Sequence, residues 1–241
     1  IDNIGFSYPG GDPVLKGINI EIREGEKTAL IGPNGSGKTT LFLICCGILK
    51  SGTGSIRVNG KEIQFKKFNP EISYLFQSPD DQLFSSTIFE DVAFGPMNMG
   101  MKKDDVREIA LQALERVDSS DLADKAPFHL SGGEKRMAGI ASLLSMNPKV
   151  LLFDEPTANL DSRNKRKVIE LIQSMTETLF ISSHNLEFLL ETCTRVIVID
   201  EGQIVADGPI KKIMSHEKLM NDHGLEKPHS LVPHQVKHHH T

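Results

Sequence analysis

The sequence predicts an α/β fold with a mainly parallel sheet, a small antiparallel β subdomain at its edge and an inserted helical subdomain. The first observation is a series of short apolar runs with the length of buried strands, at 28–31, 150–153, 179–182 and 195–199. The second is that helix-like stretches separate these runs, as in strands joined by helical crossovers. The third is a long segment without strand-like runs, from about 78 to 146, where the helical subdomain is expected.

The antiparallel edge is expected within the first 60 residues. Apolar residues there partly alternate with polar ones, as in strands with one buried face. They are Leu15, Ile18, Ile20 and Ile22. Another short strand is expected at 55–58.

Helices are expected at two places in particular. One should begin at Lys38 and include the apolar run 41–49, which is far shorter than the roughly 20 residues needed to cross a bilayer. Another lies in the inserted segment, where apolar residues recur at helical spacing. They are Val106, Ile109, Ala110, Ala113, Leu114 and Val117.

The composition is that of an ordinary globular chain, with 39 % hydrophobic and 24 % charged residues among 241. The net charge of −5 argues against broad attraction to nucleic acid or anionic lipid, because both usually require a basic face. Cys45, Cys46 and Cys193 form no C-x-x-C pair, which favours reduced thiols in a cytosolic protein. A loosely ordered, histidine-rich tail is expected at 221–241, after a domain that covers 1–220.

A glycine-rich motif lies between the first predicted core strand and its helix. It matches G-x-x-x-x-G-K-[ST], a loop whose backbone N–H groups and following helix start point at phosphate oxygens. Lys38 is expected to reach the β- and γ-phosphates of ATP, and the Thr39 hydroxyl to hold Mg²⁺. The predicted nucleotide-binding residues here are Gly32, Pro33, Asn34, Gly35, Ser36, Gly37, Lys38, Thr39 and Thr40.

Two adjacent carboxylates follow the apolar run 150–153. Asp154 is placed to bind the Mg²⁺ shell, and Glu155 to polarise the water that attacks the γ-phosphate. The alternative is that both acids only stabilise the start of a following helix. Together with the phosphate loop, the pair predicts an enzyme that hydrolyses ATP.

Residues 130–134, Leu-Ser-Gly-Gly-Glu, resemble the signature of the ATP-binding-cassette (ABC) ATPases. The resemblance runs from Phe6 to about Pro209, with the motifs in the family order. It implies the phosphate-loop NTPase core of that family and an ATPase domain over 1–220. It also disfavours a small-molecule phosphate-loop kinase.

The resemblance implies roles for further residues. Tyr8 would stack on adenine, and Gln77 would contact Mg²⁺ and sense the transport subunit. His184 would contact the γ-phosphate and join Glu155 and Lys38 as a catalytic residue. Asp161 would belong to a dimer-contact loop. The alternatives are a core aromatic residue for Tyr8 and a simple helix cap for Asp161.

The signature also has a physical meaning of its own. Ser131 and Glu134 form an S-x-x-E capping box, while Gly132 and Gly133 leave the start of the next helix open to a close ligand. The alternative is a cap and nothing more. In the family, this helix start meets the γ-phosphate bound to the opposite subunit. The resemblance therefore implies a dimer with an identical or paralogous chain, closed by ATP and opened by hydrolysis.

Residues 77–84 and 90–96 resemble the ATPases of energy-coupling-factor importers, which include cobalt, nickel and vitamin uptake systems. The resemblance implies a peripheral position on the cytoplasmic face of the cell membrane. The implied partners are a transmembrane scaffold subunit and a substrate-capture membrane subunit. The alternative is a soluble ABC ATPase that acts on nucleic acid or the ribosome. A single cassette, an acidic balance and the lack of heptads disfavour it, so no nucleic-acid partner is expected.

Aromatic and methionine side chains gather between 83 and 101. They either line a groove for a scaffold helix, since methionine surfaces adapt well to partner helices, or fill the core of the helical subdomain. They are Phe84, Phe89, Phe94, Met97, Met99 and Met101.

Histidines are concentrated near the C-terminus. One interpretation is a tail that senses a divalent metal. Chance exposure and a cloning remnant at 238–240 are favoured instead, because free tails rarely preorganise ligands. The residues are His216, His223, His229, His234, His238, His239 and His240.

Overall fold

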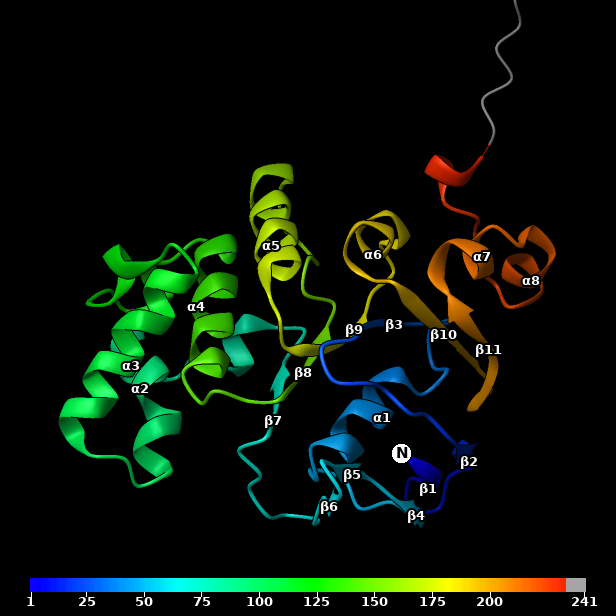
Figure 1. Ribbon diagram of the computed structural model, residues 1–241, viewed down its shortest axis with the longest axis horizontal. Helices are drawn as coiled ribbons and strands as arrows, with labels where there is room; N and C mark the ends of the chain where they lie inside the picture. The colour runs from blue at the N-terminus through cyan, green and yellow to red at the C-terminus, as the bar shows by residue number, and fades with distance from the viewer. Residues whose placement is uncertain (233–241) are drawn as a thin grey trace, which may run out of the picture.

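The computed structural model describes residues 1–232, which form a six-stranded sheet, two small antiparallel sheets and surrounding helices (Figure 1). The order in the large sheet is β11-β10-β3-β9-β8-β7. All neighbours are parallel except β10 and β11. The strands are β3 Lys27–Ile31, β7 Ile72–Leu75, β8 Val150–Asp154, β9 Thr178–Ser182, β10 Arg195–Asp200 and β11 Gln203–Pro209. The four predicted core strands are therefore confirmed.

The antiparallel edge is also present, with different boundaries. One sheet joins β1 (Asp2–Ser7) to β2 (Pro13–Ile18) and β4 (Thr53–Ser55), and a hairpin joins β5 (Arg57–Val58) to β6 (Lys61–Glu62). The single strand expected at 55–58 was wrong, because the chain changes sheets at the buried Ile56. Ile20 lies outside the strands but is buried, so its place in the alternation reflects burial and not ladder pairing.

The segment between β7 and β8 is helical, and it lies to one side of the large sheet (Figure 1). Its three α-helices are α2 (Ile88–Asn98), α3 (Lys103–Arg116) and α4 (Gly132–Leu144). The segment also contains three 3₁₀ turns: η1 (Pro79–Asp81) precedes α2, and η2 (Ser120–Leu122) and η3 (Pro127–His129) lie between α3 and α4. A capping box at Thr87 and Glu90 begins α2, which fixes where this helix starts.

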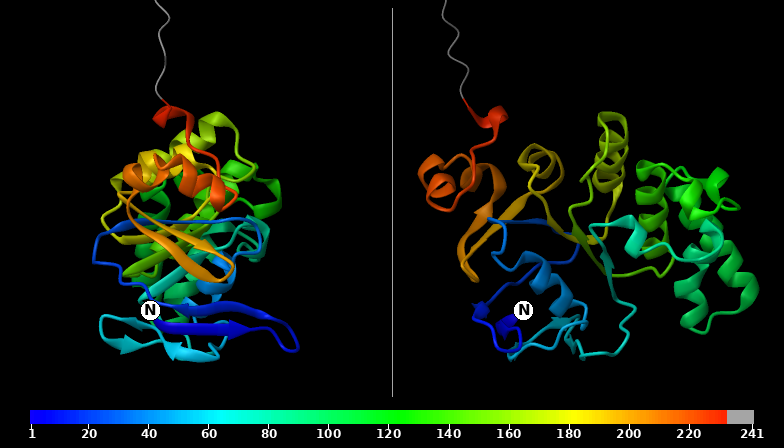
Figure 2. Two further views of the ribbon diagram at one scale, coloured as in Figure 1. Left: turned by 90° about the vertical axis from the view of Figure 1, so that its right-hand side faces the viewer. Right: turned by 180° about the vertical axis from the view of Figure 1, so that it is seen from behind.

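The remaining helices cover both faces of the large sheet. On one face lies α1 (Lys38–Cys45) with the antiparallel sheets, and on the other lie α5 (Ser162–Ser174) and α6 (Leu186–Thr192) (Figure 2). The helix expected to include 41–49 ends at Cys45, because Gly47 takes a positive φ of 71° and donates its N–H to the carbonyl oxygen of Ile44. No helix within residues 1–232 is long and apolar enough to span a bilayer.

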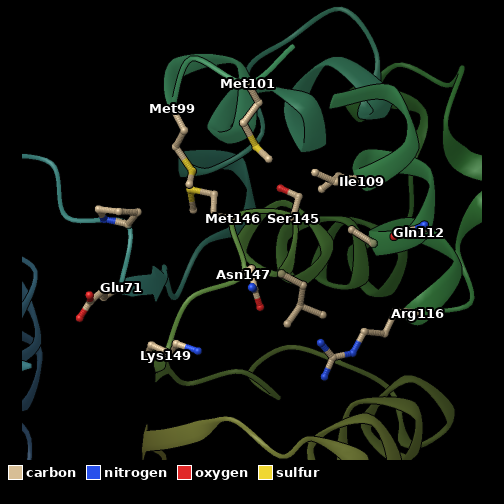
Figure 3. Close-up of a pocket in the computed structure, with 13 residues that line it drawn as sticks. Glu71, Met99, Met101, Ile109, Gln112, Arg116, Ser145, Met146, Asn147 and Lys149 are labelled. Carbon is tan, nitrogen blue, oxygen red and sulfur yellow. The ribbon is translucent and has the colours of Figure 1, made fainter. Parts of the chain in front are cut away.

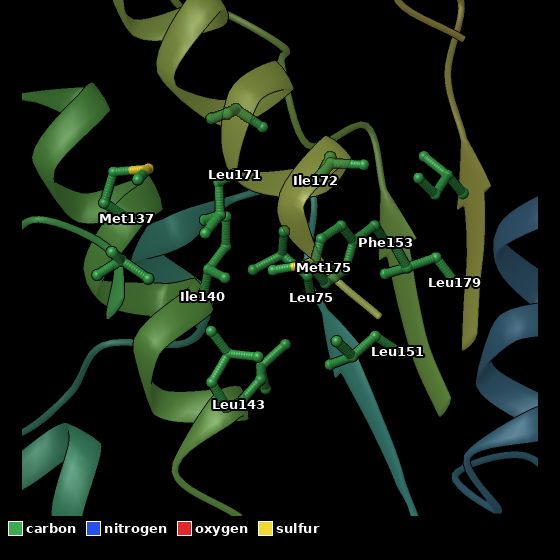
Figure 4. Close-up of a cluster of buried hydrophobic side chains, with 14 of the residues drawn as sticks. Leu75, Met137, Ile140, Leu143, Leu151, Phe153, Leu171, Ile172, Met175 and Leu179 are labelled. Atoms are coloured by element: carbon green, nitrogen blue, oxygen red, sulfur yellow. The ribbon is translucent and has the colours of Figure 1, made fainter. Parts of the chain in front are cut away.

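The sheet separates two hydrophobic clusters, and β8 contributes to both. Leu151 and Phe153 point into the cluster shared with α4 and α5 (Figure 4), while Leu152 points into the cluster shared with α1. Alternate burial on two faces explains why this strand is a continuous apolar run. Each fully buried side chain of this size contributes about 1.5–3 kcal/mol of transfer free energy.

After α7 (Ile210–Met214) the chain forms α8 (Glu217–Asp222) and η4 (His229–Leu231), so the start of the predicted tail, which begins at residue 221, is ordered against the domain. The Nδ1 atom of His223 lies 2.8 Å from Oδ2 of Asp200. Ser230 donates its N–H and its hydroxyl to Glu187, at 3.0 and 2.6 Å.

The expectation of a loosely ordered tail was therefore wrong for the described part, 221–232. Leu225 and Leu231 pack against the larger cluster and supply the apolar contacts that hold it. His216 accepts the N–H of Leu219 at the start of α8, so it has a structural role. His234 and His238 to His240 lie outside the described residues.

Candidate functional site

The phosphate-loop residues 32–39 connect β3 to α1 in a conformation that requires glycine. Gly37 has a φ of 104°, and a Cβ atom there would lie 2.7 Å from Cδ2 of Leu15. A Cβ atom at Gly35 would meet nothing within 4 Å, so this side of the loop is open. The loop therefore presents backbone toward open space, as close approach of a phosphate requires.

Two polar groups of this loop turn inward. The Nζ atom of Lys38 donates to the carbonyl oxygens of Gly32 and Pro33, at 2.8 and 2.9 Å. Burial lowers the pKa of Lys38, while Glu155 and Asp154 act in the opposite direction. The buried hydroxyl of Ser36 has no partner within residues 1–232. A bound phosphate would supply the missing acceptor and the negative charge, so the loop fits a nucleotide triphosphate.

Asp154 ends β8 and is the acceptor of three hydroxyl groups. Thr39 Oγ1 donates to its Oδ2 atom at 2.8 Å and the Tyr74 hydroxyl at 3.0 Å, while Ser182 Oγ donates to Oδ1. Mg²⁺ prefers oxygen ligands. In nucleotide sites it is usually held by one or two protein groups, and substrate phosphates supply further ligands. The paired oxygens of Thr39 and Asp154 fit that donor set, and Gln77 lines the same cavity.

Glu155 is fixed by its backbone and by two donors. It takes a φ of 49° and donates its N–H to the carbonyl oxygen of Ser182. Its Oε2 accepts Ser183 Oγ at 3.0 Å, and its Oε1 accepts the His184 N–H at 2.7 Å. The His184 ring atom Nε2 lies 3.7 Å from the same Oε1. Burial raises the pKa of Glu155 despite these donors, so the carboxylate is a stronger base than an exposed one.

Tyr8 lines the same cavity as Lys38 and Glu155. Its hydroxyl is 3.2 Å from Oγ1 of Thr40, and its ring packs edge-on against Phe6 at 4.9 Å between centroids. The side chain is 44 % exposed, so the alternative that Tyr8 is a core residue was wrong.

One cavity brings together most of the predicted site residues, from β1–β2, the phosphate loop, β7, β8 and β9. Gly32, Pro33 and Ser36 belong to the phosphate loop but do not line the cavity. The lining residues are Tyr8, Val14, Asn34, Gly35, Gly37, Lys38, Thr39, Thr40, Gln77, Asp154, Glu155 and His184.

The signature residues do not line this cavity. Ser131 Oγ accepts the Glu134 N–H at 3.3 Å and Glu134 Oε2 accepts the Ser131 N–H at 2.8 Å, so the expected capping box is present. A Cβ atom at Gly132 would meet nothing within 4 Å, whereas one at Gly133 would clash with Asn164 at the start of α5. The start of α4 is therefore exposed on one side and packed on α5 on the other.

Asp161 lies at the same junction. It caps α5 by accepting the N–H of Asn164 at 2.9 Å, and it also accepts the side-chain amide of Asn164 at 2.7 Å. The helix-cap interpretation therefore applies within this chain. Asp161 lies outside the cavity that holds Lys38.

Four residues of the site were missed by the sequence reasoning as functional groups. Tyr74, Ser182 and Ser183 hold the two carboxylates, and Arg136 donates to the carbonyl oxygens of Phe76 and Gln77. The available signals were hydroxyl groups at strand ends and one arginine among apolar residues of α4. Neither signal is specific without the fold.

Comparisons with known proteins identify the family. The family model described as ABC transporter matches residues 15–158. The chain belongs to this family. An ABC transporter ATP-binding protein of Synechocystis sp. is 51 % identical over 231 residues, which cover 96 % of this chain and 81 % of the relative.

Two further matches belong to a narrower group of ABC transporter ATPases. The energy-coupling factor transporter ATP-binding protein EcfA of Methanothermobacter thermautotrophicus is 40 % identical over 234 residues, which cover 94 % of this chain and 75 % of EcfA. The structure of cbiO1 from Clostridium perfringens, part of the ABC transporter complex cbiONQ, has a TM-score of 0.81 and 35 % identity, with 92 % of each chain covered. This ABC protein is thus an ATP-hydrolysing transporter subunit of the EcfA and CbiO type.

The ABC protein has a second cavity at the N-terminal ends of β7 and β8, whereas the site lies at the C-terminal ends of the strands (Figure 3). Met99, Met101 and Met146 line it together with Arg116. Met99 and Met101 therefore do not fill the core of the helical subdomain, whereas Phe89 packs against that core.

Proposed function

We propose that this chain is the ATPase of an energy-coupling-factor importer that takes up a metal ion, cobalt or nickel, or a vitamin. The observation that carries the proposal is the cavity that unites Lys38, Thr39, Asp154 and Glu155, next to an exposed α4 start that lies outside it. The likeness to EcfA and cbiO1 supports the importer branch. The ATPase domain would span 1–220, with the helical subdomain at about 78–146.

The hydrolytic step follows from the residues of the cavity. Lys38 would exchange its two loop carbonyl acceptors for phosphate oxygens. Thr39, Asp154 and Gln77 would hold Mg²⁺, which would neutralise charge that develops on the transferred phosphate. Glu155 would orient and polarise the attacking water, and the His184 ring beside it would contact the γ-phosphate.

The second half of the working site would come from another subunit. Ser131 and the exposed Gly132 present the positive start of α4 to solvent within a single chain. Helix starts bind anions, so the γ-phosphate of a facing subunit is the fitting partner. ATP would then close the dimer and hydrolysis would open it.

The surface for the membrane scaffold would lie on the helical subdomain. Phe84 and Phe94 pack edge-to-face with centroids 4.9 Å apart, yet they are 66 % and 49 % exposed. Met97 is 64 % exposed on the same helix as Phe94. An aromatic pair with a methionine beside it offers an adaptable surface for an apolar helix. This contact would hold the ATPase at the cytoplasmic face of the membrane.

The test is the partner that purifies with the chain from membranes. We expect a polytopic scaffold subunit, and we expect Phe84→Ala with Phe94→Ala to weaken its binding at least about tenfold while ATP affinity stays unchanged. Phe68→Ala is the matched control, because Phe68 is 60 % exposed outside the helical subdomain. Co-purification with ribosomes or DNA instead would favour a soluble ABC ATPase.

A further inference from the structure

Arg136 is the largest side chain that is almost completely buried, with 1 % of it exposed. It lies on α4, five residues after the Ser131 cap. A guanidinium is seldom buried in this way unless specific partners compensate for its lost hydration. The hydrogen-bond partners that replace this hydration therefore indicate the role of Arg136.

The partners of Arg136 are two consecutive carbonyl oxygens at the end of β7. Nη1 donates to the oxygen of Phe76 at 2.7 Å, and Nη2 donates to the oxygen of Gln77 at 2.6 Å. The Nε atom has no partner within residues 1–232. Burial lowers the pKa of Arg136 to about 10, and the charges of Asp154 and Glu155 act against this decrease. The side chain therefore stays cationic at neutral pH and makes charge-assisted hydrogen bonds.

These bonds connect two parts of the molecule with different tasks. Gln77 lines the cavity that holds Lys38 and Asp154 in the same chain. The start of α4 lies outside that cavity, and under the proposed function it serves the nucleotide on the facing subunit. A planar fork with two parallel bonds fixes orientation as well as distance, which one flexible contact does not.

We propose that Arg136 is a positioning residue that couples the two nucleotide sites of the dimer, by making the start of α4 move together with Gln77. The inference rests on the proposed ATPase dimer. Engagement of Ser131 by a nucleotide on one subunit would shift α4, and Arg136 would carry this shift to Gln77 in the other site.

Other contacts between α4 and this segment are less suited to the task. Lys135 Nζ lies 2.6 Å from Oδ1 of Asp80, but the Asp80 side chain is 73 % exposed. Exposed pairs of this kind contribute only about 0–1 kcal/mol. Gln82 donates to Gly139 deeper in α4, away from the start of the helix. Arg136 is thus the contact that reaches Gln77 itself.

The test is a double-mutant cycle on the purified transporter complex, with ATP hydrolysis measured against ATP concentration. Arg136→Met keeps the volume of the buried stem and removes the fork, and Gln77→Ala removes the group through which Arg136 would act. Lys135→Met is the matched control on the same helix. We expect a wild-type Hill coefficient above one and, for Arg136→Met, a value near one with kcat lowered about tenfold.

The cycle separates coupling from a merely structural role. In the Gln77→Ala background, Arg136→Met should lower kcat by less than about twofold, because residues that act in series are not additive. Arg136→Lys, which restores the charge without the fork, should recover part of the cooperativity. Lys135→Met should change kcat by less than about twofold relative to its parent protein in both backgrounds.

Three results would overturn the inference: a wild-type Hill coefficient of one, an unchanged coefficient in Arg136→Met, or the same tenfold loss in both backgrounds. Thermal unfolding of each variant accompanies the kinetics. If Arg136→Met fails to fold, Arg136→Lys takes its place in the cycle, and a Hill coefficient for Arg136→Lys equal to that of the wild type would overturn the inference. A wild-type complex that does not hydrolyse ATP would instead contradict the proposed function.

Discussion

Replacement of Glu155 by glutamine tests the catalytic geometry with little change in shape. Oε1 of Glu155 accepts a backbone N–H from His184 and Oε2 accepts the hydroxyl of Ser183. A glutamine amide keeps an oxygen for the N–H, and its NH₂ group can donate to the Ser183 hydroxyl after that hydroxyl rotates. Both contacts persist, so the free energy of unfolding should change by less than about 1 kcal/mol.

The substitution should instead slow the chemical step of ATP hydrolysis. A positioned general base contributes about 10²–10⁴-fold to a rate, so kcat should decrease by that factor, or about 3–5 kcal/mol of activation free energy. ATP should still bind, and the dimer should persist in ATP because it no longer hydrolyses the nucleotide. The measurements are single-turnover hydrolysis, equilibrium ATP binding and light scattering with ATP.

Glu187→Gln is the matched control, because Glu187 also accepts one hydroxyl and one backbone N–H, both from Ser230. This variant should hydrolyse ATP at the wild-type rate. If Glu155→Gln retains more than about a tenth of wild-type kcat, Glu155 does not act as the base. A variant that stays monomeric in saturating ATP would refute the closing model.

The pH dependence of kcat in the wild type should report the protonation of Glu155. Burial raises the pKa of Glu155. As the pH falls, Glu155 therefore becomes protonated at a higher pH than an exposed glutamate, whose pKa is about 4.3. In a plot of kcat against pH, the decrease at low pH should therefore have its midpoint above this value. The residual activity of Glu155→Gln should lack this decrease. The raised pKa means that protonation favours the folded state, so this contribution to stability is present at low pH and is lost as pH rises through the folded-state pKa.

Two further predictions concern binding and stability. Lys38→Ala should weaken ATP binding at least about 100-fold, since the ammonium is the main charge facing the phosphates, and unchanged affinity in calorimetry would show that the phosphate loop has been misassigned. Phe153→Ala should lower the free energy of unfolding in urea by about 3–5 kcal/mol because Phe153 is completely buried, and a loss below about 1 kcal/mol would contradict the two-cluster core.

The central strands were predictable because they are buried on both faces and so are apolar throughout, as in 150–153. The change of sheets at Ile56 was not predictable, because β4 pairs with the distant β1 whereas β5 turns away to pair with β6. The ordered segment after α8 was missed because its polar residues dominate the composition, although Leu225 and Leu231 provide the packing.

Some residues of the candidate site were likewise predictable from the sequence and others were not. Lys38 and Thr39 belong to a contiguous motif whose backbone geometry is local, so the sequence was sufficient. Two of the three hydroxyl donors of Asp154, Tyr74 and Ser182, come from β7 and β9, which lie on either side of β8. Such contacts depend on strand order, which no local pattern states.

The position of β8 has a consequence for how this enzyme tolerates mutation. The strand carries Asp154 at its end, and its three preceding residues anchor opposite layers of the molecule. A substitution that loosens either layer therefore shifts the carboxylate as well as lowering stability. Variants with damaged cores should lose turnover before they unfold, and selection for activity alone would preserve packing far from the nucleotide.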